Sequence, residues 1–164
     1  SGDPSAKGIL NGPVINTAAR ERILDWIQEA LDAGATLLCG GTHEGNLIAP
    51  TLLENVPDTC KLFAEEVFGP VAILESVPDV PAAITRVNQS KYGLHAGIFT
   101  RDIGTVQRAF KDLEVGGVLV NEVPTFRADH MPYGGMKESG LGREGVRYAM
   151  EDFCERKTLV QKSV

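Results

Sequence analysis

The feature that most constrains the fold is an alternation of short apolar runs with amphipathic segments between residues 71 and 121. The apolar runs are typical of strands: "VAILESV" at 71–77, "HAGIFT" at 95–100 and "GGVLVN" at 116–121. A strand–helix–strand–helix–strand order favours right-handed crossovers between parallel strands. The pattern therefore predicts an α/β fold with an open, mostly parallel sheet flanked by helices.

The two segments between these strands are typical of helices. Asp79 is placed to cap a first helix that runs to about Asn88, and Asp102 is placed to cap a second. Each segment has one apolar face, formed by Val80, Ala83, Ile84 and Val87 in the first and by Val106, Ala109 and Phe110 in the second. We expect these faces to pack inside the protein.

The first third of the chain predicts another helix. Residues 1–16 are rich in Gly, Pro and Asn and indicate an extended lead-in. Asn16 then offers an N-cap for a helix over 18–33, and Gly34 is suited to its C-terminal cap. Its apolar residues have helical spacing: Ile23, Ile27, Ala30 and Leu31, with Trp26 beside them.

Two further strands are predicted before residue 71. The run "ATLLCGG" at 35–41 is short, apolar and closed by glycines, which favours a buried strand. The run "NLIAPTLLENV" at 46–56 predicts a strand containing Pro50. Because proline has no backbone N–H, that strand is expected to lie at an edge or to be interrupted.

Regular patterns end after residue 121. Residues 122–142 are dense in Gly, Pro, Asp and Asn, and a helix is expected to resume over 143–153. The chain closes with "KTLVQKSV", which alternates like a strand with no following partner. We therefore divide the chain into a main part, 1–153, and a terminal strand, 154–164, suited to oligomerisation because a bare apolar edge favours pairing with another subunit.

Composition excludes several classes of function. The net charge of −6 comes from 16 basic and 22 acidic residues, which argues against a nucleic-acid or anionic-membrane surface. No run approaches the roughly 18 apolar residues that span a bilayer, and we see no secretory signal. The cysteines are odd in number and widely spaced, and the histidines are isolated, so we expect no disulfide framework, no metal site and a reducing, cytoplasmic location. They are Cys39, Cys60, Cys154, His43, His95 and His130.

The stretch "EEVFGPV" at 65–71 allows two interpretations. In the first, a helix ends and a strand begins, with Phe68 in the core. In the second, a carboxylate and the aromatic ring hold a ligand, and Gly69-Pro70 turns the chain so that both face one cleft. The residues alone favour the first interpretation.

Several motifs, in order, resemble the aldehyde dehydrogenase superfamily. They are "NGPVI" at 11–15, "EEVFGPV" at 65–71, "NQSKYGLHAGIFTRD" at 88–102, "GGVLVNE" at 116–122, "MPYGGMKESGLGREG" at 131–145 and "ERKTLV" at 155–160. The resemblance covers essentially the whole chain and implies the C-terminal part of the catalytic domain of an enzyme that oxidises an aldehyde to a carboxylate with NAD or NADP. The glycine-dense segment is structural in this family.

The resemblance also implies what this chain lacks. The family's nucleophilic Cys and general-base Glu lie in motifs that are not found here, and none of the three cysteines has a matching context. We therefore assign no catalytic residue and expect the chain alone to be inactive. Two alternatives stay open: a truncated interaction module without catalytic activity, and part of a CoA-acylating aldehyde dehydrogenase.

The resemblance assigns cofactor contacts to the 65–71 stretch. Glu66 matches the residue that accepts hydrogen bonds from the nicotinamide ribose hydroxyls. A carboxylate suits a vicinal diol because each of its oxygens can accept one bond. Phe68 matches the aromatic residue near the nicotinamide ring, whereas Glu65 has no clear assignment.

The resemblance places the 122–133 loop at the mouth of the substrate tunnel. Asn121 matches an asparagine near the active site, and we expect it to support the site. The expected substrate-binding residues are Phe126, Arg127, His130 and Tyr133. Arg127 is suited to bind the anionic tail of an aldehyde. Its alternatives are an ion pair with Asp129 or exposure to solvent.

Overall fold

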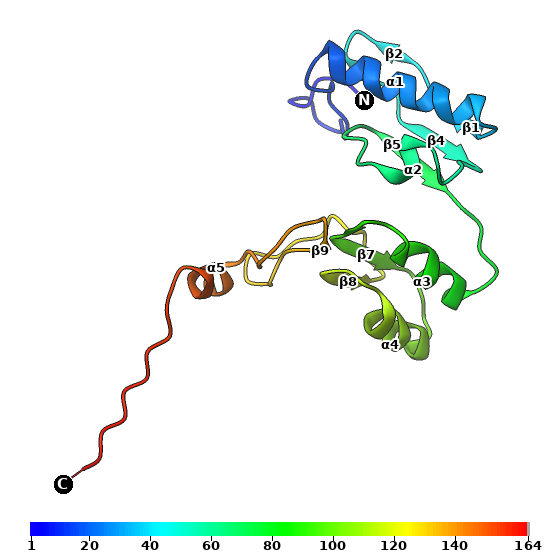
Figure 1. Cartoon of the computed structure of the whole chain (residues 1–164). Helices are drawn as coiled ribbons and strands as arrows, with labels where there is room; N and C mark the ends of the chain where they lie inside the picture. The colour runs from blue at the N-terminus through cyan, green and yellow to red at the C-terminus, as the bar shows by residue number, and fades with distance from the viewer. Residues whose placement is uncertain (164) are drawn as a thin grey trace. The chain divides into compact units, whose positions relative to one another are not determined.

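The structure is a computed structural model that describes residues 1–163, and the chain divides into two compact units, Ser1–Ser76 and Val77–Val164. Both units combine helices with short strands (Figure 1), so the predicted mixed α/β class is confirmed. Within the described part of the chain, no helix combines the length and the apolar character needed to cross a membrane.

The main helix of the first unit begins and ends where the sequence predicts. Helix α1 spans Thr17–Asp32, and the side chain of Asn16 accepts a hydrogen bond from the Ala19 N–H at 2.8 Å. Gly34 follows the C-cap in the left-handed region, with φ of +102°, and donates to the Leu31 carbonyl at 3.0 Å. A glycine suits this position because a Cβ is strained at positive φ.

Three strands form the sheet of the first unit. Strand β4 (Thr51–Glu54) lies between β1 (Thr36–Cys39), which is antiparallel to it, and β5 (Val71–Leu74), which is parallel. The predicted burial of the "ATLLCGG" strand is wrong. All four residues of β1 are exposed, because none of them belongs to the buried core cluster or packs against it, whereas Val71 and Ile73 of the other edge strand, β5, do pack against it.

Pro50 interrupts the predicted strand over 46–56 rather than placing it at an edge. The first piece is β3 (Leu47–Ile48), which pairs with β2 (His43–Glu44), and the second piece is the central strand β4. Pro50 lies between the two pieces, where no ladder hydrogen bond is required of it.

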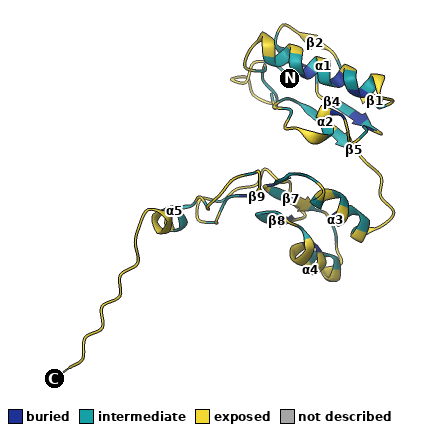
Figure 2. Cartoon of the chain, viewed as in Figure 1, coloured by how far each residue is buried: buried dark blue, intermediate teal, exposed yellow. Residues whose placement is uncertain are grey.

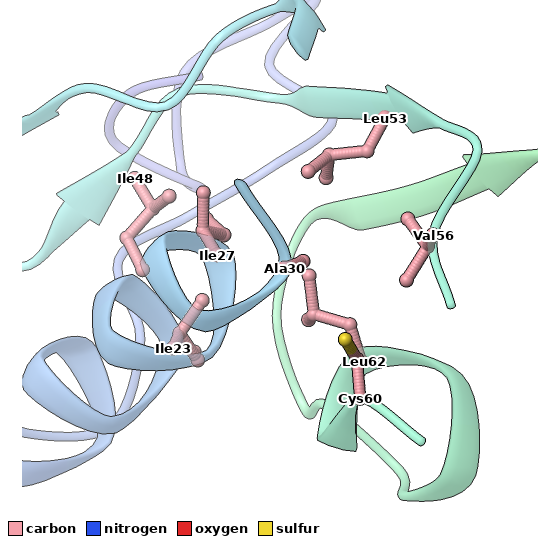
Figure 3. Close-up of a cluster of buried hydrophobic side chains, with 8 residues drawn as sticks. All are labelled: Ile23, Ile27, Ala30, Ile48, Leu53, Val56, Cys60 and Leu62. Atoms are coloured by element: carbon pink, nitrogen blue, oxygen red, sulfur yellow. The ribbon is translucent and has the colours of Figure 1, made fainter. Parts of the chain in front are cut away.

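The core of the first unit lies between α1 and the sheet (Figure 3). The short helix α2 (Lys61–Ala64) adds to it. Its buried members are Ile23, Ile27, Ala30, Ile48, Leu53, Val56, Cys60 and Leu62. The apolar positions of α1 that were predicted from helical spacing supply three of these eight residues.

The second unit contains the two predicted capped helices. Helix α3 (Val80–Asn88) is capped by Asp79, and helix α4 (Ile103–Asp112) is capped by Asp102. Strands β7 (His95–Ile98) and β8 (Gly117–Val120) are parallel neighbours, which confirms this part of the predicted strand–helix–strand order.

The single open sheet predicted over residues 71–121 is wrong. Strand β5 belongs to the first unit and pairs with β4, whereas β7 pairs with β8 in the second. An apolar run indicates a strand that is covered by other elements, but it does not specify which neighbouring strand supplies the hydrogen bonds. Phe110 also departs from prediction, because its side chain on α4 is 77% exposed.

The end of the chain has little regular structure. Residues 122–142 contain only β9 (Met136–Lys137), which pairs with β6 (Tyr92–Gly93), so the predicted loss of regularity is confirmed. Helix α5 (Val146–Asp152) follows. Residues 154–163 are exposed and form neither helix nor strand, and the last residue of the predicted terminal strand, 164, lies outside the described residues.

Candidate functional site

The loop between α2 and β5 displays both predicted cofactor-binding side chains. Glu66 is exposed, and Phe68 is 72% exposed, so the interpretation that placed Phe68 in the core is wrong. The backbone of Phe68 has φ of +50°. A bulky residue rarely adopts this left-handed conformation, and such strain persists only where surrounding contacts hold it.

Two contacts hold this loop on the first unit. The guanidinium of Arg22 donates to the Val67 carbonyl at 2.8 Å, and its Cζ lies 4.5 Å from the centroid of the Trp26 ring. A Cβ added to Gly69 would lie 2.7 Å from Cδ1 of the buried Ile23. No sequence pattern predicts this role of Arg22, because the role depends on a side-chain hydrogen bond to a backbone carbonyl 45 positions away.

A cavity of about 380 Å³ lies against Phe68. It is lined by residues 10–15 on one side and 68–70 on the other. Two motifs whose nearest ends are 50 positions apart in the chain, "NGPVI" and "EEVFGPV", therefore meet at one cavity of the first unit. Most of its lining residues have apolar side chains or none, but polar atoms contribute more of the lining surface than apolar atoms do.

In the second unit, Asn121 ties the ends of the two parallel strands together. It follows β8 directly, its N–H donates to the Ile98 carbonyl at 2.7 Å, and its side-chain oxygen accepts from the Thr100 N–H at 2.9 Å. Asn121 also has φ of +55°, in the left-handed region that asparagine tolerates better than most residues. This geometry fits a supporting role at the carboxyl ends of parallel strands.

Arg127 and Tyr133 lie together in the 122–133 loop. The Arg127 guanidinium lies 4.2 Å from the centroid of the Tyr133 ring and pairs with the Glu144 carboxylate at 2.6 Å. The partner of Arg127 is thus Glu144 and not Asp129. The backbones of Tyr133 and Glu144 bond reciprocally, at 3.1 and 2.6 Å, which holds the pair in register. Glu144 was missed because its importance depends on this long-range bridge.

The remaining predicted substrate residues are less closely joined. Phe126 is 48% exposed, and its N–H donates to the Val123 carbonyl at 3.1 Å in a local turn. His130 lines a cavity of about 690 Å³ beside α5, whereas Tyr133 lines a different one of about 410 Å³. The structure therefore brings Arg127 and Tyr133 together, whereas His130 lines a different cavity from Tyr133.

The cysteines have the environments of unreactive thiols or of surface residues. Cys39 and Cys154 are exposed and free, and Cys60 is buried. Burial, aided by the negative charge of Glu29, raises the pKa of the Cys60 thiol. A raised pKa keeps a thiol protonated and weakens it as a nucleophile, so Cys60 is suited to packing in the core.

Comparison with known proteins gives a family match over most of the chain. The sequence model of the family described as "Aldehyde dehydrogenase family" matches residues 1–159. A 3-sulfolactaldehyde dehydrogenase from Priestia aryabhattai is 41% identical over 159 residues, which are 97% of this chain and 33% of that protein. The chain therefore spans about a third of the length of the curated relatives it matches.

Solved structures agree with the family match. Aldehyde dehydrogenase 21 from Physcomitrella patens, in complex with the reaction product succinate, has a TM-score of 0.94 and 44% identity, covering 98% of this chain and 34% of that one. A glyceraldehyde-3-phosphate dehydrogenase from Methanocaldococcus jannaschii, complexed with NADP, has a TM-score of 0.80 and 42% identity, covering 86% and 30%. A betaine aldehyde dehydrogenase from Staphylococcus aureus, in complex with NAD⁺, has a TM-score of 0.81 and 35% identity, covering 87% and 29%.

Proposed function

The chain belongs to the aldehyde dehydrogenase family, and on that premise we propose that it forms the C-terminal part of the catalytic domain of an NAD- or NADP-dependent enzyme that oxidises an aldehyde to a carboxylate. The observation that carries the proposal is the display of Glu66 and Phe68 on a loop held in a strained conformation. Solved members of the family are complexed with either cofactor. The cysteine pattern favours a cytoplasmic location.

The side chains of this loop fit a nicotinamide nucleotide. When bound, the nicotinamide accepts a hydride from the substrate. The exposed Glu66 carboxylate has two oxygens that can each accept a hydrogen bond from a ribose hydroxyl. The exposed Phe68 ring offers a flat apolar surface. Val67 lies between Glu66 and Phe68 in the chain, and the hydrogen bond from Arg22 to its carbonyl holds it in place. The loop would thereby restrict how the ring end of the cofactor moves.

We assign Arg127 to an anionic substrate tail. The 3-sulfolactaldehyde of one relative and the succinate bound to the Physcomitrella enzyme both carry anionic groups. The ion pair between Arg127 and Glu144 is roughly half exposed, and such pairs contribute only about 0–1 kcal/mol. The free energy needed to replace Glu144 by a substrate carboxylate or sulfonate is therefore small. The Tyr133 ring keeps the guanidinium in place during this exchange.

The terminal segment completes the proposal. Leu159 and Val160 are each 87% exposed in a stretch that forms no strand within this chain. We assign residues 154–164 to strand pairing with a second copy of the protein. Sedimentation of the longer enzyme with and without this segment tests the assignment, since an unchanged oligomeric state after its removal would contradict it.

The proposal first predicts that the chain by itself is inactive. The nucleophile and the base are expected elsewhere in the longer enzyme, and removing such members of a catalytic unit costs on the order of 10⁴- to 10⁶-fold in rate. Pure chain incubated with NAD or NADP and a panel of aldehydes should produce no reduced cofactor. Steady turnover that scales with the concentration of the chain would disprove the proposal.

The sharper test replaces Glu66 by Gln in the longer enzyme. The variant keeps the shape of the side chain but loses charge-assisted hydrogen bonds worth roughly 1.5–3 kcal/mol. Hydride transfer measured in a single turnover should slow about ten- to a hundredfold. Glu65→Gln, one residue away on the same loop, is the matched control and should change the rate much less. Equal rates for wild type and Glu66→Gln would remove the cofactor assignment.

A second variant tests the substrate class. Arg127→Met removes the guanidinium, which lies 4.2 Å from the centroid of the Tyr133 ring, and leaves an unbranched apolar side chain in its place. For an anionic aldehyde, kcat/KM should fall by ~2–5 kcal/mol of transition-state binding. A neutral aldehyde of similar size should be affected little. If kcat/KM falls equally for both aldehydes, or for neither, Arg127 does not bind the anionic group of the substrate.

A further inference from the structure

The side chain of His95 makes contacts at two well-separated points of the 122–133 loop. His95 is the first residue of β7, and its Nδ1 lies 3.1 Å from the Pro124 carbonyl oxygen. Its ring also meets the Tyr133 ring edge-on, with 4.9 Å between centroids and an interplanar angle of 80°. One side chain on a strand therefore contacts both ends of the segment from 124 to 133.

The first contact fixes where the proton lies on the ring. A carbonyl oxygen can only accept, so the bond to Pro124 requires the proton on Nδ1. Nε2 is one of two side-chain nitrogen or oxygen atoms, among residues 1–163, that are buried without a hydrogen-bond partner. An unpaired buried nitrogen is unfavourable, and an apolar ring of the same shape avoids that cost. Packing alone therefore does not explain a histidine here.

The opposite strand leaves space for the ring. His95 is paired in register with Gly117 of β8. A Cβ added to Gly117 would lie 2.8 Å from Cδ2 and 2.9 Å from Nε2 of His95, closer than real Cβ contacts allow. The glycine thus lets the imidazole lie across the parallel pair and reach the loop.

We propose that His95 is a positioning residue for the substrate loop. By bonding Pro124 and packing against Tyr133, it sets the path of the chain between them. That path includes Arg127, whose guanidinium lies over the Tyr133 ring. Tyr133 therefore contacts both His95 and Arg127. The inference rests on the proposed function of the loop in binding the aldehyde, and it assigns His95 no contact with substrate.

The test uses His95→Phe in the longer enzyme. Phenylalanine keeps the edge contact with Tyr133 and removes both the bond to Pro124 and the unpaired nitrogen. The thermal midpoint should stay the same or rise, while the KM for the anionic aldehyde rises about five- to tenfold. The KM for NAD or NADP should not change, because the cofactor residues belong to a different loop.

Two further variants make the test specific. His95→Asn places an amide N–H near the position of Nδ1 and should restore much of the aldehyde KM. His43→Phe is the matched control, since His43 is an exposed histidine on β2 in the first unit and should change neither KM. In the isolated chain, His95→Phe should speed amide hydrogen exchange over 125–133 and leave β7 and β8 protected.

The outcomes separate this inference from the proposed function. If Glu66→Gln slows hydride transfer but His95→Phe leaves both the aldehyde KM and loop exchange unchanged, the function stands and His95 is not a positioning residue. If His95→Phe lowers the thermal midpoint and raises both KM values together, its role is general stability and the inference is overturned. If loop exchange rises while the aldehyde KM stays constant, the loop does not bind substrate and the inference also fails.

Discussion

The two compact units of this chain differ in how much apolar surface they cover. In the first unit, eight hydrophobic residues form one buried cluster (Figure 3). In the second, the buried hydrophobic residues among those described are Ile84, Ala109 and Leu119, and exposed positions predominate (Figure 2). Helix α4 shows the difference, because Ile103 is 68% exposed and Phe110 is 77% exposed.

The difference indicates which unit is stabilised by its own buried residues. A buried cluster of this size stabilises the first unit, and the proposed cofactor loop is attached to it through Ile23. The second unit relies on close backbone contacts at glycines and on a pair of parallel strands. Parallel strands are usually covered on both faces. We therefore expect the second unit, with the proposed substrate loop, to depend on surfaces that the rest of the proposed longer enzyme would supply.

The largest effect that follows is a core truncation in the first unit. Leu53 is fully buried in β4, so Leu53→Ala should lower the unfolding free energy by about 2–5 kcal/mol through lost burial and a residual cavity. Trp26, the single tryptophan, lies on α1 and reports on this unit by fluorescence during denaturation.

A matched truncation in the second unit is the control. Leu141 is fully exposed, so Leu141→Ala should change the unfolding free energy by no more than about 0.5 kcal/mol. A similar cost for both variants would mean that the Leu141 side chain is covered in solution.

The next effect concerns backbone packing in the second unit. A Cβ added to Gly116 would overlap the Gly134 carbonyl oxygen, and a backbone group cannot rotate away as a side chain can. Gly116→Ala should destabilise this unit by roughly 1–3 kcal/mol. Hydrogen exchange of α3 and α4 should rise, while the Trp26 transition keeps its midpoint. A shifted Trp26 midpoint would show that the two units unfold together.

Local elements of the fold could be predicted from the sequence because their causes are local. The caps Asn16, Asp79 and Asp102 bond to N–H groups within three residues, and the helices begin where they predict. Pro50 interrupts a strand for an equally local reason, the missing N–H. Strand pairing is not local, which is why β5 was assigned to the wrong sheet.

The candidate site divides in the same way. Glu66, in the motif at 65–71, and Arg127, in the loop between two motifs, could be named from the sequence, and the structure places both at the surface. Their supporting partners could not be named. Arg22, His95 and Glu144 act through contacts 17 to 45 positions away in the chain, and no spacing rule reports such contacts.

A smaller effect is expected when one helix cap is removed in each unit. Asn16→Ala and Asp79→Ala each remove one side-chain acceptor, at 2.8 Å from a backbone N–H, and each should cost about 1 kcal/mol of helix stability. We expect α1 to stay fully helical because its core holds it, and α3 to fray. Secondary chemical shifts measure both, and Ser at either position should restore the cap. Equal fraying of both helices would contradict the contrast between the units.

The smallest effect is a response of the second unit to acid. Hydrogen bonds from the Thr105 hydroxyl, the Thr105 N–H and the Gly104 N–H lower the pKa of the Asp102 carboxyl below its ordinary value. A carboxyl with a lowered folded pKa contributes stability that is complete above its unfolded pKa, about 3.9. That contribution is lost as the pH falls through the lower, folded pKa.

Helix α4 should therefore loosen at its first turn when the pH is lowered below about 4, whereas α1 should not, because its cap Asn16 does not titrate. Secondary chemical shifts over 103–112 and 17–32, recorded between neutral pH and strong acid, measure the two responses side by side. Asp102→Asn keeps an acceptor at the cap but removes the titrating proton, so it should abolish the local pH dependence of α4. If α4 in that variant still loosens over the same pH range, Asp102 is not the group responsible. If α1 loosens at the same pH as α4 in the wild type, acid acts on the chain as a whole and the contrast between the two units does not extend to their helix caps.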